Sequence, residues 1–204
     1  SFSGNTGTIT ARPINITADS NQSKIYGNAN PVVLTYSAEA SSGSRGLVAG
    51  DSFTGALSRA SGENVGSYAI NQGTVTNSNY AINYVPANFA ITPRPITFSA
   101  NSSTKVYSDI DPTLSVSVTS GSLASIAVTD TLAEVTGMLS RSAGENVGNY
   151  NISLGSGVNA GAKAGNYSVT YISDSLAITP APLSVTGANR TTTYSGLAQT
   201  NSAA

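Results

Sequence analysis

The sequence contains no cysteine, no histidine and no tryptophan. Without cysteine the chain forms no disulfide and offers no thiolate as a nucleophile or metal ligand. Without histidine it lacks the commonest general base and a common zinc ligand. These absences argue against Ser-His-Asp catalysis and against haem or zinc chemistry, so we expect a protein that is not an enzyme and holds no such cofactor.

Charged residues are also scarce. They make up 9% of the 204 residues, and the formal net charge is -1. So weak a field gives no electrostatic steering toward nucleic acid or an anionic membrane. No run of about 18 apolar residues is present, so we expect no membrane insertion. No Lys/Arg-led signal peptide opens the chain, so an export signal would have to lie outside this sequence.

One segment of the chain occurs twice. LSRASGENVGSYAI at residues 57–70 returns as LSRSAGENVGNYNI at residues 139–152, identical at 10 of 14 positions and offset by 82 residues (139 minus 57). Self-similarity at a fixed period is the sequence signature of a repeat protein. The shared Gly-Glu-Asn-Val-Gly core is therefore part of a repeated structural unit.

Other landmarks divide the chain at the same period. ITARPINIT at residues 9–17 returns as ITPRPITFS at 91–99 and as ITPAPLSVT at 178–186. We interpret the sequence as a piece of a longer array. The predicted parts are the tail of a preceding repeat over 1–11, repeat 1 over 12–93, repeat 2 over 94–180, and the start of a truncated third repeat over 181–204.

Within each repeat, apolar residues alternate with polar ones. Leu114, Val116 and Val118 share one face of PTLSVSV, and Tyr80 and Ile82 share one face of YAINY. This period of two is typical of half-buried strands, and Gly, Asn, Asp and Pro separate the strands at short intervals. We predict an all-β fold of two tandem, small β-sandwich (Ig-like) repeats, with β-grasp-like repeats as the alternative. We expect a short helical turn only over residues 47–51.

The predicted junction between the repeats is stiff. Residues 91–96 are Ile-Thr-Pro-Arg-Pro-Ile, and the Pro-X-Pro core favours extended backbone. A repeat of this size buries only about 60–65% of its unfolded surface, so contacts with neighbouring repeats should add stability. We therefore expect an elongated rod in which neighbouring repeats of the same chain are partners.

Two Arg–Glu pairs lie inside the repeated segment. Arg59 and Glu63 are four residues apart, as are Arg141 and Glu145. Glycines on both sides of each glutamate relieve φ restrictions in a turn. We predict that each pair is an ion pair across a turn between two strands. The alternative is a ligand or metal contact, whereas a catalytic role would need a partner acid or base that is not nearby in sequence.

Three further features leave other chemistry open. Asp51, Asp109 and Asp111 offer oxygen ligands for calcium, but the latter two stand where repeat 1 has asparagine. Lys24 and Lys105 precede a tyrosine in loops that we interpret as structural, with a Lys–Asn or Lys–Asp isopeptide crosslink as the alternative. The ten tyrosines alternate along strands, which favours core packing over a sugar-binding strip.

These landmarks carry a family resemblance. The segments KIYGNANPVVLTYS, GLVAGDSFTGALSR, GENVGSYAI and NYAINYVPANFAITPRPI resemble the MBG repeat of the YGX type. Repeat 2 departs from the pattern, because Ser108 replaces the glycine after Tyr107. The ending TTTYSGLAQT resembles the related YDG-type repeat, with Ser195 in place of aspartate.

The resemblance implies a tandem module of large bacterial surface or secreted proteins similar to filamentous-haemagglutinin-like adhesins. It implies an extracellular or cell-surface location and supplies no catalytic residues. The leading hypothesis is a non-enzymatic stalk that projects a binding region for attachment to a cell or surface. The alternative is direct binding of a host or surface glycan, or of mucin.

Overall fold

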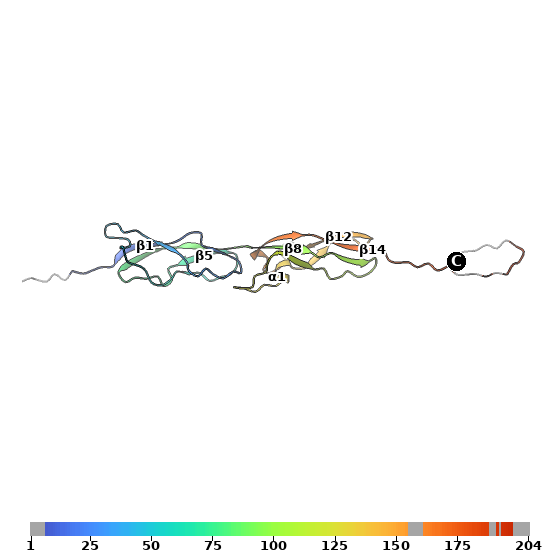
Figure 1. Cartoon of the computed structure of the whole chain (residues 1–204), viewed down its shortest axis with the longest axis horizontal. Helices are drawn as coiled ribbons and strands as arrows, with labels where there is room; N and C mark the ends of the chain where they lie inside the picture. The colour runs from blue at the N-terminus through green and yellow to red at the C-terminus, as the bar shows by residue number, and fades with distance from the viewer. Residues whose placement is uncertain (1–6, 155–160, 188–190, 192, 198–204) are drawn as a thin grey trace, which may run out of the picture.

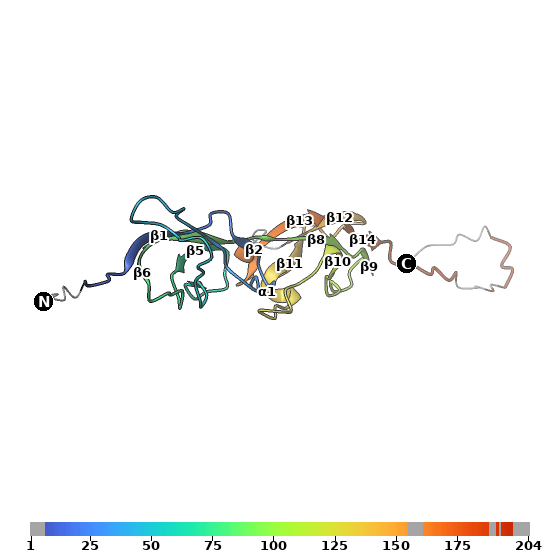
Figure 2. The same cartoon turned by 60° about the vertical axis from the view of Figure 1, so that its left-hand side comes forward.

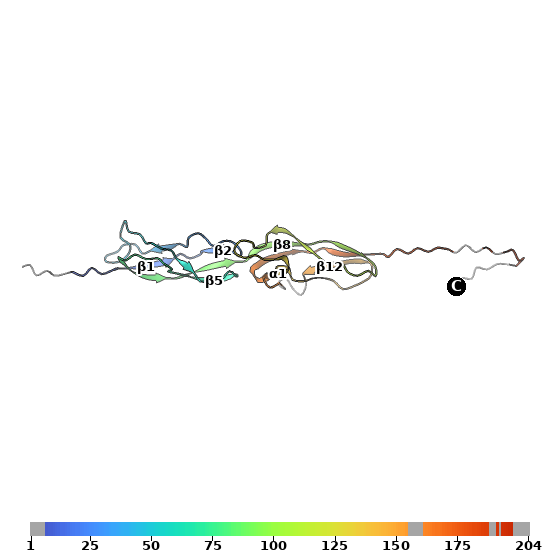
Figure 3. The same cartoon turned by 90° about the horizontal axis from the view of Figure 1, so that it is seen from below.

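The computed structural model describes residues 7–154, 161–187, 191 and 193–197. Two bodies lie end to end along the long axis, as predicted for a rod (Figure 1 and Figure 3). Strands dominate both bodies, which confirms the all-β, two-repeat prediction. The flanking stretches 1–11 and 181–204 lie partly outside the described residues, and their described parts form no strand.

The strands of repeat 1 form two sheets. Their order is β3-β1-β6 in one sheet and β2-β7-β5-β4 in the other. The bounds are Arg12–Ala18 for β1, Ser23–Ile25 for β2, Tyr36–Ala38 for β3, Ser58–Arg59 for β4, Gly66–Asn71 for β5, Tyr80–Val85 for β6 and Ala87–Thr92 for β7.

Repeat 2 repeats this arrangement strand for strand. Its sheets have the orders β10-β8-β13 and β11-β12-β14-β9. The bounds are Arg94–Ala100 for β8, Ser103–Val106 for β9, Val116–Gly121 for β10, Leu139–Arg141 for β11, Gly148–Leu154 for β12, Tyr167–Ile172 for β13 and Ser175–Thr179 for β14.

Both sheets of each repeat contain one parallel pair. β1 runs parallel to β6 and β2 to β7, and in repeat 2 β8 pairs with β13 and β9 with β14 in the same way. An immunoglobulin sandwich is built from antiparallel sheets. Parallel pairing of the first strands with the last ones is therefore closer to the β-grasp-like alternative. Alternation defines the two faces of a strand but not which strand lies beside it.

Among the described residues of repeat 2, two short helices occur. α1, Leu132–Thr136, begins with a capping box in which the Thr131 hydroxyl accepts from Glu134 N–H and the Glu134 carboxylate accepts from Thr131 N–H at 2.7 Å. η1 spans Ala164–Asn166. The helical turn expected over residues 47–51 is wrong, because this segment forms a turn without a helix. No helix in the described residues is long and apolar enough to cross a membrane.

One hydrophobic cluster runs through both repeats. Alternate residues of the strands point inward, such as Phe89 in β7 and Phe98 in β8, each 0% exposed. Both phenylalanines belong to the same continuous cluster of buried residues. Only Pro93 separates β7 from β8, so the chain enters repeat 2 without a flexible linker (Figure 2). The core therefore continues across the boundary rather than ending at it.

Candidate functional site

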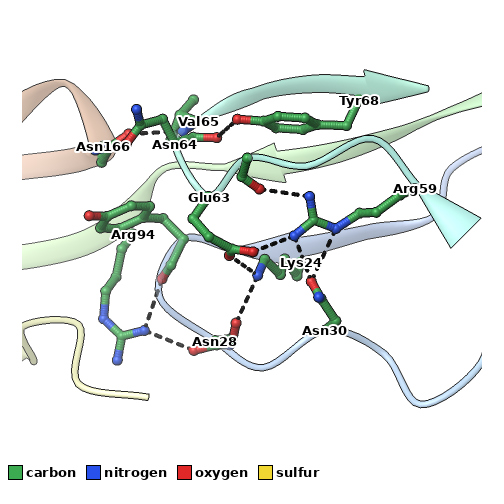
Figure 4. A network of polar contacts seen from close by, with 12 residues as sticks. Lys24, Asn28, Asn30, Arg59, Glu63, Asn64, Val65, Tyr68, Arg94 and Asn166 are labelled. Carbon is green, nitrogen blue, oxygen red and sulfur yellow. Dashed lines mark hydrogen bonds and ion pairs between the residues drawn. The ribbon is translucent and has the colours of Figure 1, made fainter. Parts of the chain in front are cut away.

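The repeated Gly-Glu-Asn-Val-Gly turn of repeat 1 holds a three-residue charge network (Figure 4). The structure brings Arg59, at the end of β4, against Glu63 as an ion pair. Arg59 also donates to the Gly62 carbonyl at 2.7 Å and lies 5.3 Å from the centre of the Tyr68 ring. These contacts fold the turn back onto β4 and β5.

Gly62 is required at its position in this turn. Its φ is +139°, and a Cβ built there would lie 2.2 Å from the Tyr68 ring. The Tyr68 hydroxyl donates to the Asn64 carbonyl at 2.7 Å, which fixes the ring against the turn. The second copy has the same geometry: Gly144 lies against the Tyr150 ring, and the Tyr150 hydroxyl donates to the Asn146 carbonyl at 2.7 Å. The glycine is therefore dictated by packing.

Lys24 is the third member of the network, and the turn sequence alone gave no sign of it. Its side chain is 3% exposed and forms an ion pair with Glu63. Its ammonium also donates to the Asn28 carbonyl at 3.1 Å. Burial opposes ionisation of Glu63, but the hydrogen bonds and charges of Lys24 and Arg59 outweigh it and lower the pKa of the carboxyl. Glu63 thus neutralises a buried lysine.

Repeat 2 forms the same network with one more acid. The structure pairs Arg141 with Glu145, and Lys105 with both Glu145 and Asp111. Asp111 stands where repeat 1 has Asn30, and Arg141 binds it at 2.7 Å. Hydrogen bonds from Arg141 and then Lys105 lower the pKa of Asp111 to about 2. All the acids of this cluster are thus engaged by cations.

This arrangement bears on calcium and on the isopeptide alternative. The described residues contain no group of three or more metal-ligating side chains. Asp109 contributes its carbonyl to Lys105 at 3.1 Å, and Asp51 lies in the other repeat. An ionised Asp111 held by Arg141 is a poor electrophile for the Lys105 amine, so we expect an intact mass equal to the unmodified sequence.

A second cluster joins the two repeats through a buried aspartate. Asp130 is 6% exposed, and its Oδ2 accepts from the hydroxyls of Tyr26 at 2.9 Å and Tyr167 at 2.8 Å. Lys163 lies 3.1 Å from the other oxygen. The two rings meet edge to face with centroids 5.5 Å apart. Tyr26 belongs to repeat 1 and the other three residues to repeat 2, so this cluster is an interface.

The charge state of this interface follows from its burial. Burial opposes ionisation of Asp130, but hydrogen bonds from Tyr167, Tyr26 and Lys163 lower its pKa overall. Burial and then Asp130 raise the pKa of Tyr26. Burial is also the largest cause that raises the pKa of Tyr167, to about 12. Near neutral pH one carboxylate is therefore held by two neutral phenols and one ammonium.

Arg94, the first residue of β8, clamps the end of repeat 1. Its Nη1 donates to the Tyr26 carbonyl at 3.2 Å and to Asn28 Oδ1 at 2.9 Å. Its Nε donates to the Ser122 carbonyl of its own repeat at 2.7 Å. Figure 4 shows Arg94 beside the Lys24 network. The arginine of the Pro-X-Pro segment thus ties both repeats together.

The far half of the Gly-Glu-Asn-Val-Gly turn also contacts repeat 2. Val65 N–H donates to Asn166 Oδ1 at 2.8 Å, and Asn166 Nδ2 donates to Asn64 Oδ1 at 3.1 Å (Figure 4). Asn166 is 8% exposed. This role of Asn166 was not predicted from the sequence, although the recurrence of Asn-Tyr at residues 79–80 and 166–167 could have pointed to it. One turn therefore carries an intra-repeat ion pair and an inter-repeat contact.

Glycine permits the close approach of the Tyr26 loop. Gly27 has φ +78°, and a Cβ there would lie 2.3 Å from the Ala124 Cβ. The Gly27 carbonyl accepts from Ala127 N–H at 3.1 Å. In repeat 2 the same turn holds Ser108 at φ +75° and Tyr107 is 46% exposed, against 0% for Tyr26. The glycine after the tyrosine is thus coupled to docking.

A groove occurs at corresponding places in the two repeats. In repeat 2 it has a volume of ≈ 640 Å³ and is lined from residues 111–116 and 132–141. In repeat 1 the groove between residues 30–34 and 56–59 measures ≈ 200 Å³. The lining is mainly apolar in repeat 2, with no reactive constellation beyond the ion pairs described above.

Together, the duplicated fold and the buried junction define a tandem-repeat protein whose consecutive units dock end to end. The chain belongs to the MBG domain (YGX type) family, which matches residues 14–90 and 96–177. This is a structural repeat family and not a known enzyme family. Comparison with curated proteins and with solved structures gave no match.

Proposed function

We propose that the two repeats are a non-enzymatic stalk segment of an extracellular bacterial adhesin. In this role they hold a binding region away from the cell and so serve attachment to a cell or surface. The proposal combines membership of a repeat family of surface proteins with the junction geometry. The absence of histidine and cysteine from the sequence is consistent with a mechanical rather than a catalytic role.

The buried Tyr26–Asp130–Tyr167 cluster is the observation that carries the proposal. A spacer must resist bending, and bending at this junction would expose a carboxylate, two phenols and a shared hydrophobic cluster. Polar groups buried with full hydrogen bonding are costly to separate. The junction thus favours one relative orientation of the repeats, which a stalk needs and an isolated binding domain does not.

Small-angle X-ray scattering of the full chain tests the stalk directly. For the wild type we expect the maximum dimension of two repeats in line. For Tyr26→Ala we expect a shorter maximum dimension and a broader distribution of interatomic distances. Tyr107→Ala is the matched control, because Tyr107 has the same place in repeat 2 but contacts no following repeat in the described residues. A wild-type curve typical of two freely jointed bodies would refute the stalk.

Direct glycan or mucin binding is the second candidate. Of the tyrosines, Tyr107 and Tyr194 are exposed, while Tyr26, Tyr80 and Tyr167 are buried. The open groove of repeat 2 is a surface that favours this candidate. A glycan array and a mucin pull-down with the full chain distinguish the two functions. Saturable binding that Met138→Glu in the groove abolishes would support the second candidate.

A further inference from the structure

The end of repeat 1 that faces away from repeat 2 carries groups equivalent to those with which repeat 2 docks onto repeat 1. We call this surface the head face. In repeat 2 the docking groups are Arg94, Ala124, Asp130 and Tyr167. In repeat 1 the corresponding head face consists of Arg12, Val48, Asp51 and Tyr80.

The tyrosine and aspartate hydrogen bonds of the two surfaces correspond, although the Lys163 contact of Asp130 has no counterpart on Asp51 among the described residues. The Tyr80 hydroxyl donates to Asp51 Oδ2 and accepts from Val48 N–H at 3.0 Å. The Tyr167 hydroxyl donates to Asp130 Oδ2 and accepts from the Ala124 N–H at 2.9 Å. The backbone N–H of each aspartate also donates to a loop carbonyl: Asp51 to Val48 at 3.1 Å, and Asp130 to Ala124 at 3.0 Å. The head face is therefore already assembled.

The arginines agree as well. Arg12 Nε donates to the Gly46 carbonyl at 2.8 Å, as Arg94 Nε donates to the Ser122 carbonyl at 2.7 Å. In Arg94 the next nitrogen, Nη1, binds the Tyr26 carbonyl of the preceding repeat. Arg12 Nη1 has no acceptor within the part of the chain that the structure describes.

The two surfaces differ in their exposure to solvent. Asp130 is 6% exposed and Ala124 1% exposed beneath the Tyr26 loop, whereas Asp51 is exposed and Val48 is 41% exposed. Ile9, which leads into the head face, is 99% exposed. An aspartate positioned by a buried tyrosine and an arginine whose Nη1 has no acceptor thus form a site that lacks its occupant in the described residues.

We propose that the head face binds the Tyr-Gly loop of another MBG repeat. The tyrosine hydroxyl donates to Asp51, and Arg12 Nη1 donates to the tyrosine carbonyl. This inference rests on the proposed stalk function and extends it, because it makes end-to-end docking a property of the repeat rather than of one junction.

The geometry also selects the occupant. Val48 stands where Ala124 stands in the formed junction, and Ala124 leaves no room for a Cβ on Gly27. A docking loop therefore needs glycine after its tyrosine. The loop of repeat 2 carries Ser108 there, so it does not fit the head face. Heterologous end-to-end contacts otherwise create open filaments, and this serine opposes polymerisation of separate chains through these two ends.

A chain extended by one repeat tests the proposal. A copy of residues 12–90 is fused directly before Ile9, so that Ile9 follows the copy as Ile91 follows residue 90. The copy carries Ile25→Val, which gives its tyrosine peptide a distinct mass. Nitration with tetranitromethane, followed by mass spectrometry, then compares the loop tyrosine of the copy with Tyr26 and Tyr107 in the same chain.

The expected result is that the copy's tyrosine is nitrated as slowly as Tyr26, and much more slowly than Tyr107. Asp51→Ala in the native repeat 1 should raise the nitration rate of the copy's tyrosine only. Gly27→Ser in the copy should have the same effect. A nitration rate of the copy's tyrosine equal to that of Tyr107 would overturn the inference. A copy that stays unfolded would also overturn it, because docking should stabilise the copy as it stabilises repeat 1. Fast nitration of native Tyr26 would instead contradict the stalk function.

Discussion

At the scale of single residues, the charge networks show how one glutamate serves two cations. Glu63 lies between Arg59 on its own hairpin and Lys24 on a distant strand. The sequence predicted the arginine, because four residues separate the two in one turn. It could not predict the lysine, which lies 39 residues away and reaches Glu63 only through the pairing of β2 with β7.

Glu63→Gln should destabilise repeat 1 by about 1–3 kcal/mol, because it leaves a buried lysine without its counter-ion. The surface pair of Glu39 with Arg45 supplies the control, and Glu39→Gln should cost less than Glu63→Gln, because no buried cation depends on Glu39. Urea unfolding of both variants measures the difference. An unchanged unfolding free energy for Glu63→Gln, together with a changed ligand affinity, would return this residue to a binding role.

Acid stability should depend on Asp111. Its pKa in the folded state, about 2, lies below the ordinary value of 3.8. Its contribution is therefore fully present above about pH 4 and is lost as the pH falls through about 2. Asp111→Asn should flatten the pH dependence of unfolding free energy in this window.

The reciprocal variant controls that experiment, since repeat 1 has Asn30 at the matching place. Asn30→Asp should steepen the acid dependence of repeat 1. Parallel pH curves for the wild type and Asp111→Asn between about pH 4 and 2 would contradict the assigned role.

At the scale of elements, the loop after β2 and the turn before β5 carry the junction. Both contain glycine at positive φ, but for different reasons. Gly62 makes room for a tyrosine of its own repeat, whereas Gly27 makes room for Ala124 of the next one. Sequence comparison of the two repeats showed where Ser108 breaks the pattern. The contact across the junction explains why the break matters.

Gly27→Ala should weaken the junction by more than its backbone strain alone. An L-residue at this φ costs about 1 kcal/mol, and the built Cβ also collides with Ala124. Gly43→Ala is the matched control, because Gly43 has φ +57° and nothing within 4 Å of its built Cβ. Hydrogen exchange at Val65 N–H reports the junction. Equal effects of the two substitutions on that exchange would show that the close approach is unimportant.

The extra helix shows a limit of local pattern. We expected a helical turn over residues 47–51, but this loop is a short turn, and the helix occurs in the longer loop of repeat 2 at Leu132–Thr136. Its capping box was visible in the sequence as Thr-X-X-Glu. A five-residue helix is too short for a periodic apolar stripe, so periodicity could not reveal it.

At the scale of the whole molecule, the junction couples the stability of the two repeats. Small repeats gain stability from their neighbours, and the hydrophobic cluster is continuous across the boundary. The rod in Figure 1 therefore follows from burial at the junction as well as from the stiff Pro-X-Pro segment. The end-to-end arrangement is therefore a property of the pair of repeats.

Tyr26→Phe should cost about 1–2 kcal/mol of that coupling, because it removes a hydrogen bond to a buried carboxylate while keeping the ring. Tyr107→Phe, at the same place in repeat 2, should leave stability unchanged within about 0.5 kcal/mol. Calorimetry should show the melting temperature lowered only in Tyr26→Phe. A similar loss in both variants would mean that the hydroxyl acts within its own repeat.

The sequence by itself determined the strand content, the repeat period and the turn in which Arg59 and Glu63 meet. These properties are local, because alternation, glycine and spacing act within a few residues. The tertiary structure decided which strands pair in parallel and that Tyr26 meets Asp130, which lies 104 residues along the chain. A contact so distant depends on how two folded repeats bury their ends together. For that reason the recurring turn, which the sequence predicted as an ion pair between two strands, is also part of the joint between repeats.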